Sequence, residues 1–462
     1  MIPPQEMVEQ ALTKSGADGC VVIASDHTET NLRWAANDLT TNGRMHSRSV
    51  TVVSTFDAAD GTRAGVVTRS VTTDDELTDL VQASERAARD ATPADDAAAL
   101  IEPYEHHDDW SAEPQGTGVE VFEQFAPALG TAFERWRKAG RLLYGFAEHM
   151  STSHFLGTST GLRRRFDQPD GRIEVNGKSG DYARSAWSAA HSEDFVDIDI
   201  EAMAASLDER LDWAARRIDL PAGRYETLLP PTAVADLMIY LYWRASARDA
   251  EEGRNVFAGR AGGTRIGERL ANLPLTLRSD PTEPGERCAP FEIVTRSVGG
   301  LQSVFDNGAP SPAVDWISEG ELADLGRTRS WAAKSGMAPR PFVDNLILEQ
   351  VGSTATLEEM IARTERGLLL TCLWYIREVD PQTLLLTGLT RDGVYLVENG
   401  QVQGAVNNFR FNESPIDLLQ RASEAGRSEH TMSREWSDYF RRTVMPPVRI
   451  PDFNMSTVSQ AS

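Results

Sequence analysis

The sequence predicts an α+β protein in two parts: an N-terminal α/β-type region with a mixed or antiparallel sheet, and a β-rich, barrel-like C-terminal domain with few helices. Three observations lead to this prediction. Patterns of helix, strands and helix follow one another over residues 5–91, polar and apolar residues alternate over 142–179, and short strand-like runs separated by turn residues fill most of 253–400. Helices and strands that are segregated in this way are typical of α+β proteins.

The first predicted elements form one α+β unit. Met7, Val8, Ala11 and Leu12 have the spacing of one helix face. Thr73 followed by Glu76 is a capping-box pattern that predicts where the second helix begins. The unit is predicted to contain a helix over 5–15, strands over 19–24, 31–35, 49–53 and 65–70, and a helix over 74–91.

The middle of the chain continues with a connection, a helix and further strands. Residues 92–118 are rich in Pro, Asp, Glu and Gly, so they are predicted to be a surface linker that divides the N-terminal region into two subdomains. A helix over 120–139 and a helix over 199–217 are predicted on either side of a set of strands. The strands are expected over 142–150, 153–159, 162–167 and 173–179, with hairpin turns at Gly157, Gly161 and Gly171.

Pro221-Ala222-Gly223 marks the predicted boundary between an N-terminal domain over 1–220 and a C-terminal domain over 221–462. Two domains agree with a prior of about 150 residues per domain. The second domain should start with a strand over 225–229, followed by a helix to about Glu252 that is capped by Thr232. One further helix is predicted over 357–364.

Composition excludes several classes of protein. The formal net charge of −23 opposes binding to a phosphate backbone, so no nucleic-acid partner is expected. The basic cluster Arg163–Arg165 is predicted to be an ordinary strand end or, alternatively, a docking patch for an acidic partner. No stretch has the roughly 18 uncharged apolar residues of a spanning helix, and no signal peptide is recognised, so a cytoplasmic protein is expected. The three scattered cysteines are predicted to be reduced and partly buried thiols.

An ordered series of short fragments characterises the last half of the sequence. Together they resemble the TldD/TldE (PmbA) family, in which one member of each pair is a zinc peptidase. The fragments are Asn255-Val256-Phe257-Ala258-Gly259, Asp280-Pro281-Thr282, Arg340-Pro341, Asn345, Gly367-Leu368-Leu369 and Val397-Glu398-Asn399-Gly400.

The resemblance implies that this chain is the TldE-like member. The peptidase member carries H-E-x-x-x-H on the helix after the first strand of the second domain, and the matching positions here lie near Met238, Ile239 and Trp243. These side chains neither bind zinc nor act as a general base. The resemblance therefore implies no catalytic residue and no metal in this chain, and zinc in a TldD-like metalloprotease subunit that joins it in a heterodimer or higher oligomer.

Other histidines were considered as metal ligands. His106-His107-Asp108-Asp109 has suitable residue types but unsuitable geometry, because adjacent side chains point in different directions. His149 and His154 are separated by about one predicted hairpin and could approach each other across strands, although satisfied surface or core histidines are far commoner. His430 occupies the C-terminal region in which the peptidase member has a cysteine ligand, but no metal role is expected for it.

The resemblance also implies an extended peptide substrate, bound by addition to a sheet edge. Leu369, Thr371 and Tyr395 lie in strand-like segments that could form that edge, whereas the alternative is that these segments are buried sheet core. The expected function is that of the non-metal subunit of a zinc metalloprotease that processes unfolded or modified peptides. The alternatives are a stand-alone peptide-binding or scaffold protein and a peptidase that is active by itself.

Overall fold

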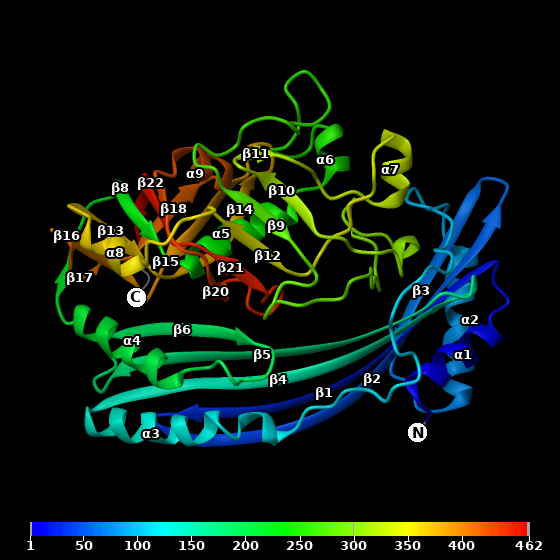
Figure 1. The fold of residues 1–462 in the computed structure, drawn as a ribbon, viewed down its shortest axis with the longest axis horizontal. Helices are drawn as coiled ribbons and strands as arrows, with labels where there is room; N and C mark the ends of the chain where they lie inside the picture. Colours follow the sequence, from blue (N-terminus) through cyan, green and yellow to red (C-terminus); the bar gives the residue numbers. More distant parts are fainter. Residues whose placement is uncertain (1, 299, 460–462) are drawn as a thin grey trace.

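The computed structural model describes residues 2–298 and 300–459 and has the expected α+β architecture. Its N-terminal part is a six-stranded sheet with the order β3-β2-β1-β4-β5-β6, and every neighbouring pair is antiparallel. Figure 1 shows this long sheet beneath the C-terminal domain. The strands are β1 (Gly19–Ala35), β2 (Asp38–Ala58), β3 (Gly61–Arg69), β4 (Arg141–Thr158), β5 (Arg163–Ser179) and β6 (Ser185–Ser192).

Four of these strands are far longer than the sequence predicted. The strands expected over 142–150 and 153–159 are one strand, β4, and those expected over 162–167 and 173–179 are one strand, β5. The predicted hairpin turns at Gly157 and Gly171 are therefore wrong, whereas Gly161 does lie in the turn between β4 and β5, with φ +101°. Gly171 is required by packing instead, because a Cβ there would lie 2.7 Å from the Phe195 ring.

Two pairs of helices cover the two ends of the sheet (Figure 1). At one end α1 and α2 pack with β1–β4 over a core that includes Met7, Leu80 and Val52. At the other end α3 and α4 pack on β4–β6 over a core that includes Trp136 and Phe195. The helices are α1 (Pro4–Lys14), α2 (Asp74–Asp90), η1 (Val119–Phe122), α3 (Phe125–Lys138) and α4 (Ile200–Trp213). The capping box of Thr73 and Glu76 is confirmed at the start of α2.

The segment between α2 and η1 joins two parts of the same sheet. β1, which precedes it, and β4, which follows it, pair over 14 residues. The segment is attached by Tyr104, whose hydroxyl donates to the Gly308 carbonyl at 2.8 Å, and by Asp108, which accepts from Arg164 at 2.5 Å. Arg163 and Arg165 pair with Glu9 and Asp167, so the basic cluster is the ordinary start of a strand.

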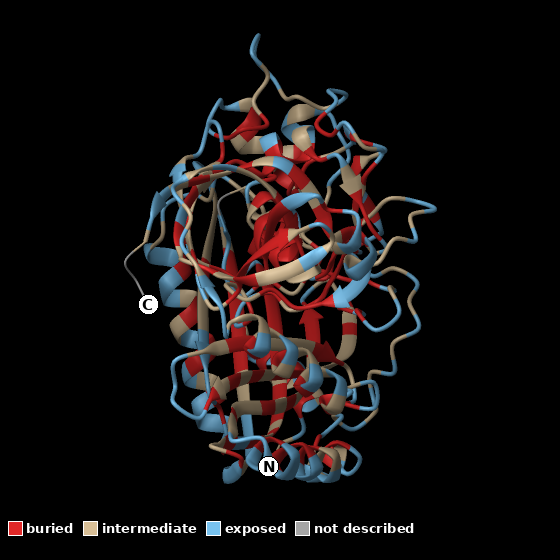
Figure 2. Cartoon of the chain, turned by 90° about the vertical axis from the view of Figure 1, so that its left-hand side faces the viewer, coloured by how far each residue is buried: buried red, intermediate tan, exposed pale blue. Residues whose placement is uncertain are grey.

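The C-terminal domain contains two sheets around helix α5 (Pro231–Trp243). α5 contacts β20 and β21 of the first sheet and β8 of the second. Figure 2 shows the buried residues concentrated in the interior of this domain. The first sheet has the order β11-β10-β9-β12-β21-β20, and the second has the order β14-β15-β18-β22-β8-β13-β16-β17-β7, with β19 beside β22.

The strands of the first sheet are β9 (Thr276–Ser279), β10 (Val314–Ser318), β11 (Glu321–Leu322), β12 (Leu346–Glu349), β20 (Glu429–Thr431) and β21 (Thr443–Met445). Those of the second are β7 (Arg217–Ile218), β8 (Gly223–Leu229), β13 (Arg366–Leu370), β14 (Leu373–Asp380), β15 (Leu385–Thr390), β16 (Val394–Glu398), β17 (Gln401–Val406), β18 (Phe409–Glu413), β19 (Glu424–Ala425) and β22 (Val448–Val458). The remaining helices are α6 (Ala247–Glu251), η2 (Val304–Asp306), α7 (Arg329–Ser335), α8 (Leu357–Ala362) and α9 (Pro415–Arg421).

A group of charged residues, largely buried except for His430, joins the long sheet to the C-terminal domain. His191 of β6 lies 3.2 Å from Asp170 of β5 and 3.3 Å from Glu286 of the C-terminal domain. Arg442 approaches Asp170 at 3.2 Å, and His430 approaches Glu286 at 2.9 Å. Burial alone would lower the pKa of His191, but the contacts with Asp170 and Glu286 outweigh it and raise the pKa to about 9. We call these five residues the interface ion cluster.

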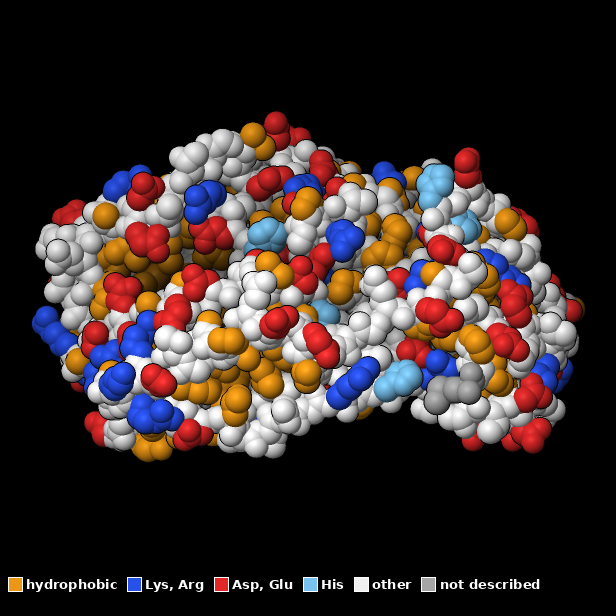
Figure 3. Space-filling view, turned by 60° about the horizontal axis from the view of Figure 1, so that its bottom comes forward, with side chains coloured by type: hydrophobic (Ala, Val, Ile, Leu, Met, Phe, Trp, Pro, Cys, Tyr) orange, Lys and Arg blue, Asp and Glu red, His pale blue; other side chains and the backbone are white. Residues whose placement is uncertain are grey.

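Three further observations bear on the composition. All three cysteines are free and buried, as predicted. Within the described ranges, no helix combines the length and the apolar composition needed to cross a bilayer. On the face seen in Figure 3, acidic side chains are interspersed with basic ones, so the net charge of −23 does not gather there in one acidic area.

Candidate functional site

Helix α5 is built to be buried. Pro230 is the N-cap and Pro231 occupies the first turn, where a missing N–H costs nothing, so the predicted cap at Thr232 is wrong. The predicted helix to Glu252 is instead two helices, α5 and α6, separated by Arg244–Ser246. Apolar side chains surround almost the whole of α5, which is typical of a helix enclosed by its domain.

The three positions that match the zinc motif lie in two environments on α5. Met238 is 3 % exposed and Ile239 is 0 % exposed, and both belong to the main hydrophobic core. Trp243 ends the helix and is partly buried. Its ring packs against Trp436, with 5.0 Å between ring centroids.

These residues do not fit a zinc ion. Zinc requires thiolate, imidazole or carboxylate ligands, and a buried isoleucine, an indole and a thioether supply none of them. Across residues 2–298 and 300–459, no group of three or more His, Cys, Asp and Glu side chains is placed to hold a metal. No step that uses zinc is therefore assigned to this chain.

An aromatic cavity of ≈ 550 Å³ opens at the C-terminal end of α5. Trp436 lies at its centre, 5.5 Å from Tyr240 between ring centroids. Arg244, at the same cavity, is held by Glu378 at 2.7 Å. The lining residues are Tyr240, Trp243, Arg244, Val298, Leu301, Gln302, Phe342, Ile376, Arg377 and Trp436. A mostly apolar cavity with a few polar groups is the usual form of a binding site for an apolar side chain.

The cavity borders β14, which is an edge strand of the second sheet. Glu435 binds this edge, because its carboxylate accepts hydrogen bonds from the backbone N–H groups of Tyr375 and Ile376 at 2.9 and 3.1 Å. Asp236 of α5 in turn accepts from the Glu435 N–H at 2.8 Å. Burial raises the pKa of Asp236 well above its ordinary value. Glu435 thus connects helix α5 to the edge strand β14, beside the aromatic cavity.

The residues predicted to contact a peptide lie elsewhere. β13 pairs with β8 on one side and β16 on the other, and β16 pairs in turn with β17. Of the two alternatives, an open edge and buried sheet core, these strands therefore form the sheet core. Leu369 and Tyr395 are buried side chains of this sheet interior, and the Thr371 N–H donates to the Gly393 carbonyl at 2.8 Å.

Most of the histidines named as possible ligands have structural partners. His106 lies 3.6 Å from Asp108, which Arg164 also binds, and His430 is paired with Glu286 at 2.9 Å. His149 and His154 lie on one strand, β4, so they do not approach each other across a hairpin. His149 contacts Thr117 at 2.7 Å, and His154 contacts Ser25 at 2.9 Å, where burial lowers its pKa to about 4.

One local signal indicates the aromatic cavity, namely the density of aromatic residues in 240–243. Trp436, Phe342 and Ile376 come from three distant segments, and nothing in the order of residues brings them together. The edge position of β14 likewise depends on strand pairing over long distances.

Comparison with known proteins identifies the C-terminal half. Residues 222–457 match the PmbA/TldA metallopeptidase C-terminal domain. No curated protein matches the sequence significantly.

Among solved structures, TldE from Thermococcus kodakarensis superposes with a TM-score of 0.79 at 16% identity, covering 97% of this chain and 98% of that one. A proposed modulator of DNA gyrase from Thermotoga maritima has a TM-score of 0.73 at 18% identity, covering 94% and 96%. Another from Bacteroides thetaiotaomicron has a TM-score of 0.75 at 13% identity, covering 98% of each chain. These likenesses establish a shared fold over nearly the full length, and the domain match shows that the chain belongs to the TldD/TldE (PmbA) family.

Proposed function

We propose that this chain is the metal-free, TldE-like subunit of a heteromeric zinc peptidase that processes unfolded or modified peptides in the cytoplasm. The observation that carries the proposal is the chemistry of α5 in a domain of this family. The positions that match the peptidase motif hold Met238, Ile239 and Trp243, and two of these are core residues. A TldD-like partner would supply the zinc and the catalytic groups.

This chain would contribute peptide binding. The aromatic cavity can accept an apolar side chain, and the neighbouring strand β14 is an edge strand on which Glu435 occupies only the Tyr375 and Ile376 N–H groups. The same two features support a second candidate, a stand-alone peptide-binding protein. The two candidates differ in whether a TldD-like partner is required for peptide cleavage.

The test is to purify the chain alone and after co-expression with the TldD-like protein of the same genome. Zinc content, complex formation by size-exclusion chromatography and cleavage of an unfolded protein substrate are measured in both samples. We expect zinc and cleavage only in the complex. Stoichiometric zinc and cleavage in the chain alone would overturn the proposal, and peptide binding without any complex would favour the stand-alone protein.

A further inference from the structure

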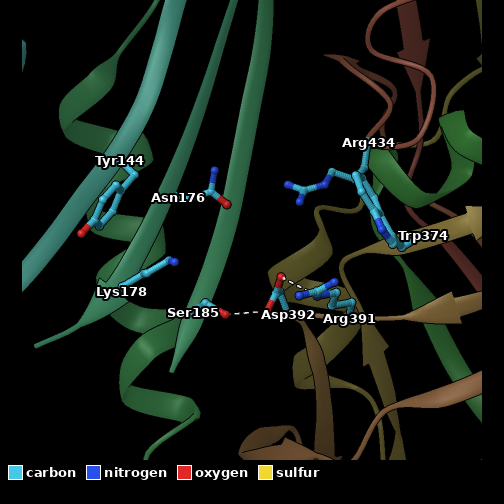
Figure 4. A pocket seen from close by; sticks show the side chains of 8 residues that line it. All are labelled: Tyr144, Asn176, Lys178, Ser185, Trp374, Arg391, Asp392 and Arg434. Atoms are coloured by element: carbon cyan, nitrogen blue, oxygen red, sulfur yellow. Dashed lines mark hydrogen bonds and ion pairs between the residues drawn. The ribbon is translucent and has the colours of Figure 1, made fainter. Parts of the chain in front are cut away.

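A second cavity, of ≈ 410 Å³, lies between the long sheet and the C-terminal domain. One wall comes from β4, β5 and β6, and the other from β14, the loop before β16 and the segment around residue 434 (Figure 4). The lining residues are Tyr144, Asn176, Lys178, Ser185, Trp374, Arg391, Asp392 and Arg434. Three of the lining side chains are cationic and one is a carboxylate, in a chain whose net charge is −23.

Arg434 is the most unusual residue of this cavity. Its guanidinium carbon lies over two indole rings, 4.5 Å from the ring centroid of Trp187 and 4.7 Å from that of Trp374. Its Nε and Nη1 atoms are buried and, within the described part of the chain, have no hydrogen-bond acceptor. Asp236, which interacts electrostatically with Arg434, accepts its side-chain hydrogen bond from the Glu435 N–H and not from the guanidinium.

Unsatisfied donors of this kind are rare. A buried N–H without an acceptor costs about 1–3 kcal/mol, and more when it carries charge, so such groups call for an explanation. Two indole rings lie within cation–π distance of the guanidinium, and the atoms without an acceptor are on its N–H edge. In Figure 4 this edge points across the cavity toward the side of Asn176.

Lys178 faces the same space from the opposite wall (Figure 4). Its ammonium lies 5.2 Å from the centroid of the Tyr144 ring, and no carboxylate among the described residues comes within ion-pair distance of it. Arg391, by contrast, has Asp392 at 3.7 Å, and Asp392 also accepts from Ser185. Two cations from different parts of the fold thus line one cavity, and neither of them forms an ion pair with a described carboxylate.

We propose that Arg434 and Lys178 bind a carboxylate group in this cavity, and that the C-terminal carboxylate of a bound peptide is the group that they hold. The planar N–H edge of a guanidinium matches the two oxygens of a carboxylate, and a lysine adds a compact positive charge. The site itself follows from the unpartnered cations, whereas the peptide as the carrier of the carboxylate rests on the proposed function.

The position of β14 supports a peptide as the carrier. Trp374 of this strand lines the cation cavity, and Ile376 and Arg377 line the aromatic cavity. The two cavities therefore lie along one edge strand, two residues apart. A peptide whose last carboxylate contacts Arg434 could reach the aromatic cavity with a neighbouring side chain.

The experiment titrates the full chain with Ala-Ala-Phe and with its C-terminal amide, followed by tryptophan fluorescence and calorimetry. We expect the free acid to bind about 10- to 100-fold more tightly than the amide, which is the range for losing a charge-assisted hydrogen bond. Arg434→Gln should abolish this preference. Arg366→Gln is the matched control, because it removes the same charge from a side chain that is 64% exposed and only pairs with Glu398 at 3.4 Å, and it should keep the preference.

Additional variants and competition experiments distinguish a carboxylate site from non-specific binding. Lys178→Gln, on the other wall, should reduce the preference several-fold, and melting curves establish that each variant is folded. Sodium acetate should compete with the peptide more strongly than sodium chloride at the same ionic strength, because the site recognises a carboxylate and not charge alone. Equal affinities for acid and amide, a preference retained by Arg434→Gln, or equal competition by acetate and chloride would overturn the proposal. Because the chain is titrated alone, these results are independent of whether it assembles with a TldD-like partner.

Discussion

Replacing His191 by glutamine should destabilise the protein in a pH-dependent way. His191 is buried in the interface ion cluster between Asp170 and Glu286, which come from the long sheet and the C-terminal domain. Glutamine keeps a similar size but removes the positive charge, so two carboxylates remain without the cation between them. The loss of one partner of a buried ionic contact is costly because the other charges stay desolvated.

The size of the destabilisation follows from the pKa of His191. The pKa of His191 rises from an ordinary 6.5 to about 9, and a shift of roughly 2.5 pH units at about 1.36 kcal/mol each gives about 3 kcal/mol. Since the folded-state pKa is raised, this stabilisation is fully present below about pH 6.5 and is lost as the pH rises through about 9. The difference in the free energy of unfolding between wild type and H191Q should therefore be about 3 kcal/mol at pH 6 and under about 1 kcal/mol at pH 9.5.

The assay is urea unfolding followed by far-ultraviolet circular dichroism at pH 6.0, 7.5 and 9.5. His107→Gln is the control, because His107 is exposed and a surface substitution should change the free energy of unfolding by less than about 0.5 kcal/mol. His430→Gln is measured in parallel, because the hydrogen bond to Glu286 also raises the pKa of His430. Parallel pH profiles for H191Q and wild type would refute the reasoning.

Three further predictions concern stability and are measured by chemical or thermal unfolding. Asp236→Asn should change the free energy of unfolding by less than about 1 kcal/mol at pH 7, because burial favours the neutral carboxyl group and an amide resembles it. A decrease in the free energy of unfolding of more than about 3 kcal/mol would contradict this. Gly171→Ala should lower the free energy of unfolding by about 1–3 kcal/mol, because the added methyl group would contact Phe195. Gly130→Ala on α3 should raise it by about 0.5–1 kcal/mol, because the methyl group meets nothing within 4 Å. The reverse order of stabilities would be inconsistent with the packing. Thr356→Ala should cost about 1 kcal/mol by removing the capping box of α8, and an unchanged midpoint would show that the cap is dispensable.

Local signals in the sequence were reliable where the interaction is local. The capping box of Thr73 and Glu76 was predicted because both partners lie within four residues, and the burial of α5 was predicted because its apolar composition surrounds the helix. The α+β class and the order of most helices followed from the same kind of pattern.

Features that depend on distant partners were not predictable. Gly157 and Gly171 resemble turn residues, but close contacts with Val8 and Phe195 require them inside long strands. Whether β13 is an edge or a core strand could not be decided from the sequence, because its pairing with β8 joins segments far apart. Arg434 makes cation–π contacts with Trp187 and Trp374, and no local sequence pattern connects these three residues.

The pairing of β1 with β4 has a consequence for synthesis on the ribosome. Its partners, from Val21 with Thr158 to Trp34 with Gly145, are separated by more than a hundred residues. During translation, β1 can therefore pair with β2, but its other edge stays unpaired until β4 has emerged from the ribosome. A nascent chain would carry a long strand with one unpaired edge and an apolar first third during that interval, and unpaired strand edges are prone to aggregate. Chaperone binding to the nascent chain is expected to be concentrated in the period before residue 158 leaves the exit tunnel.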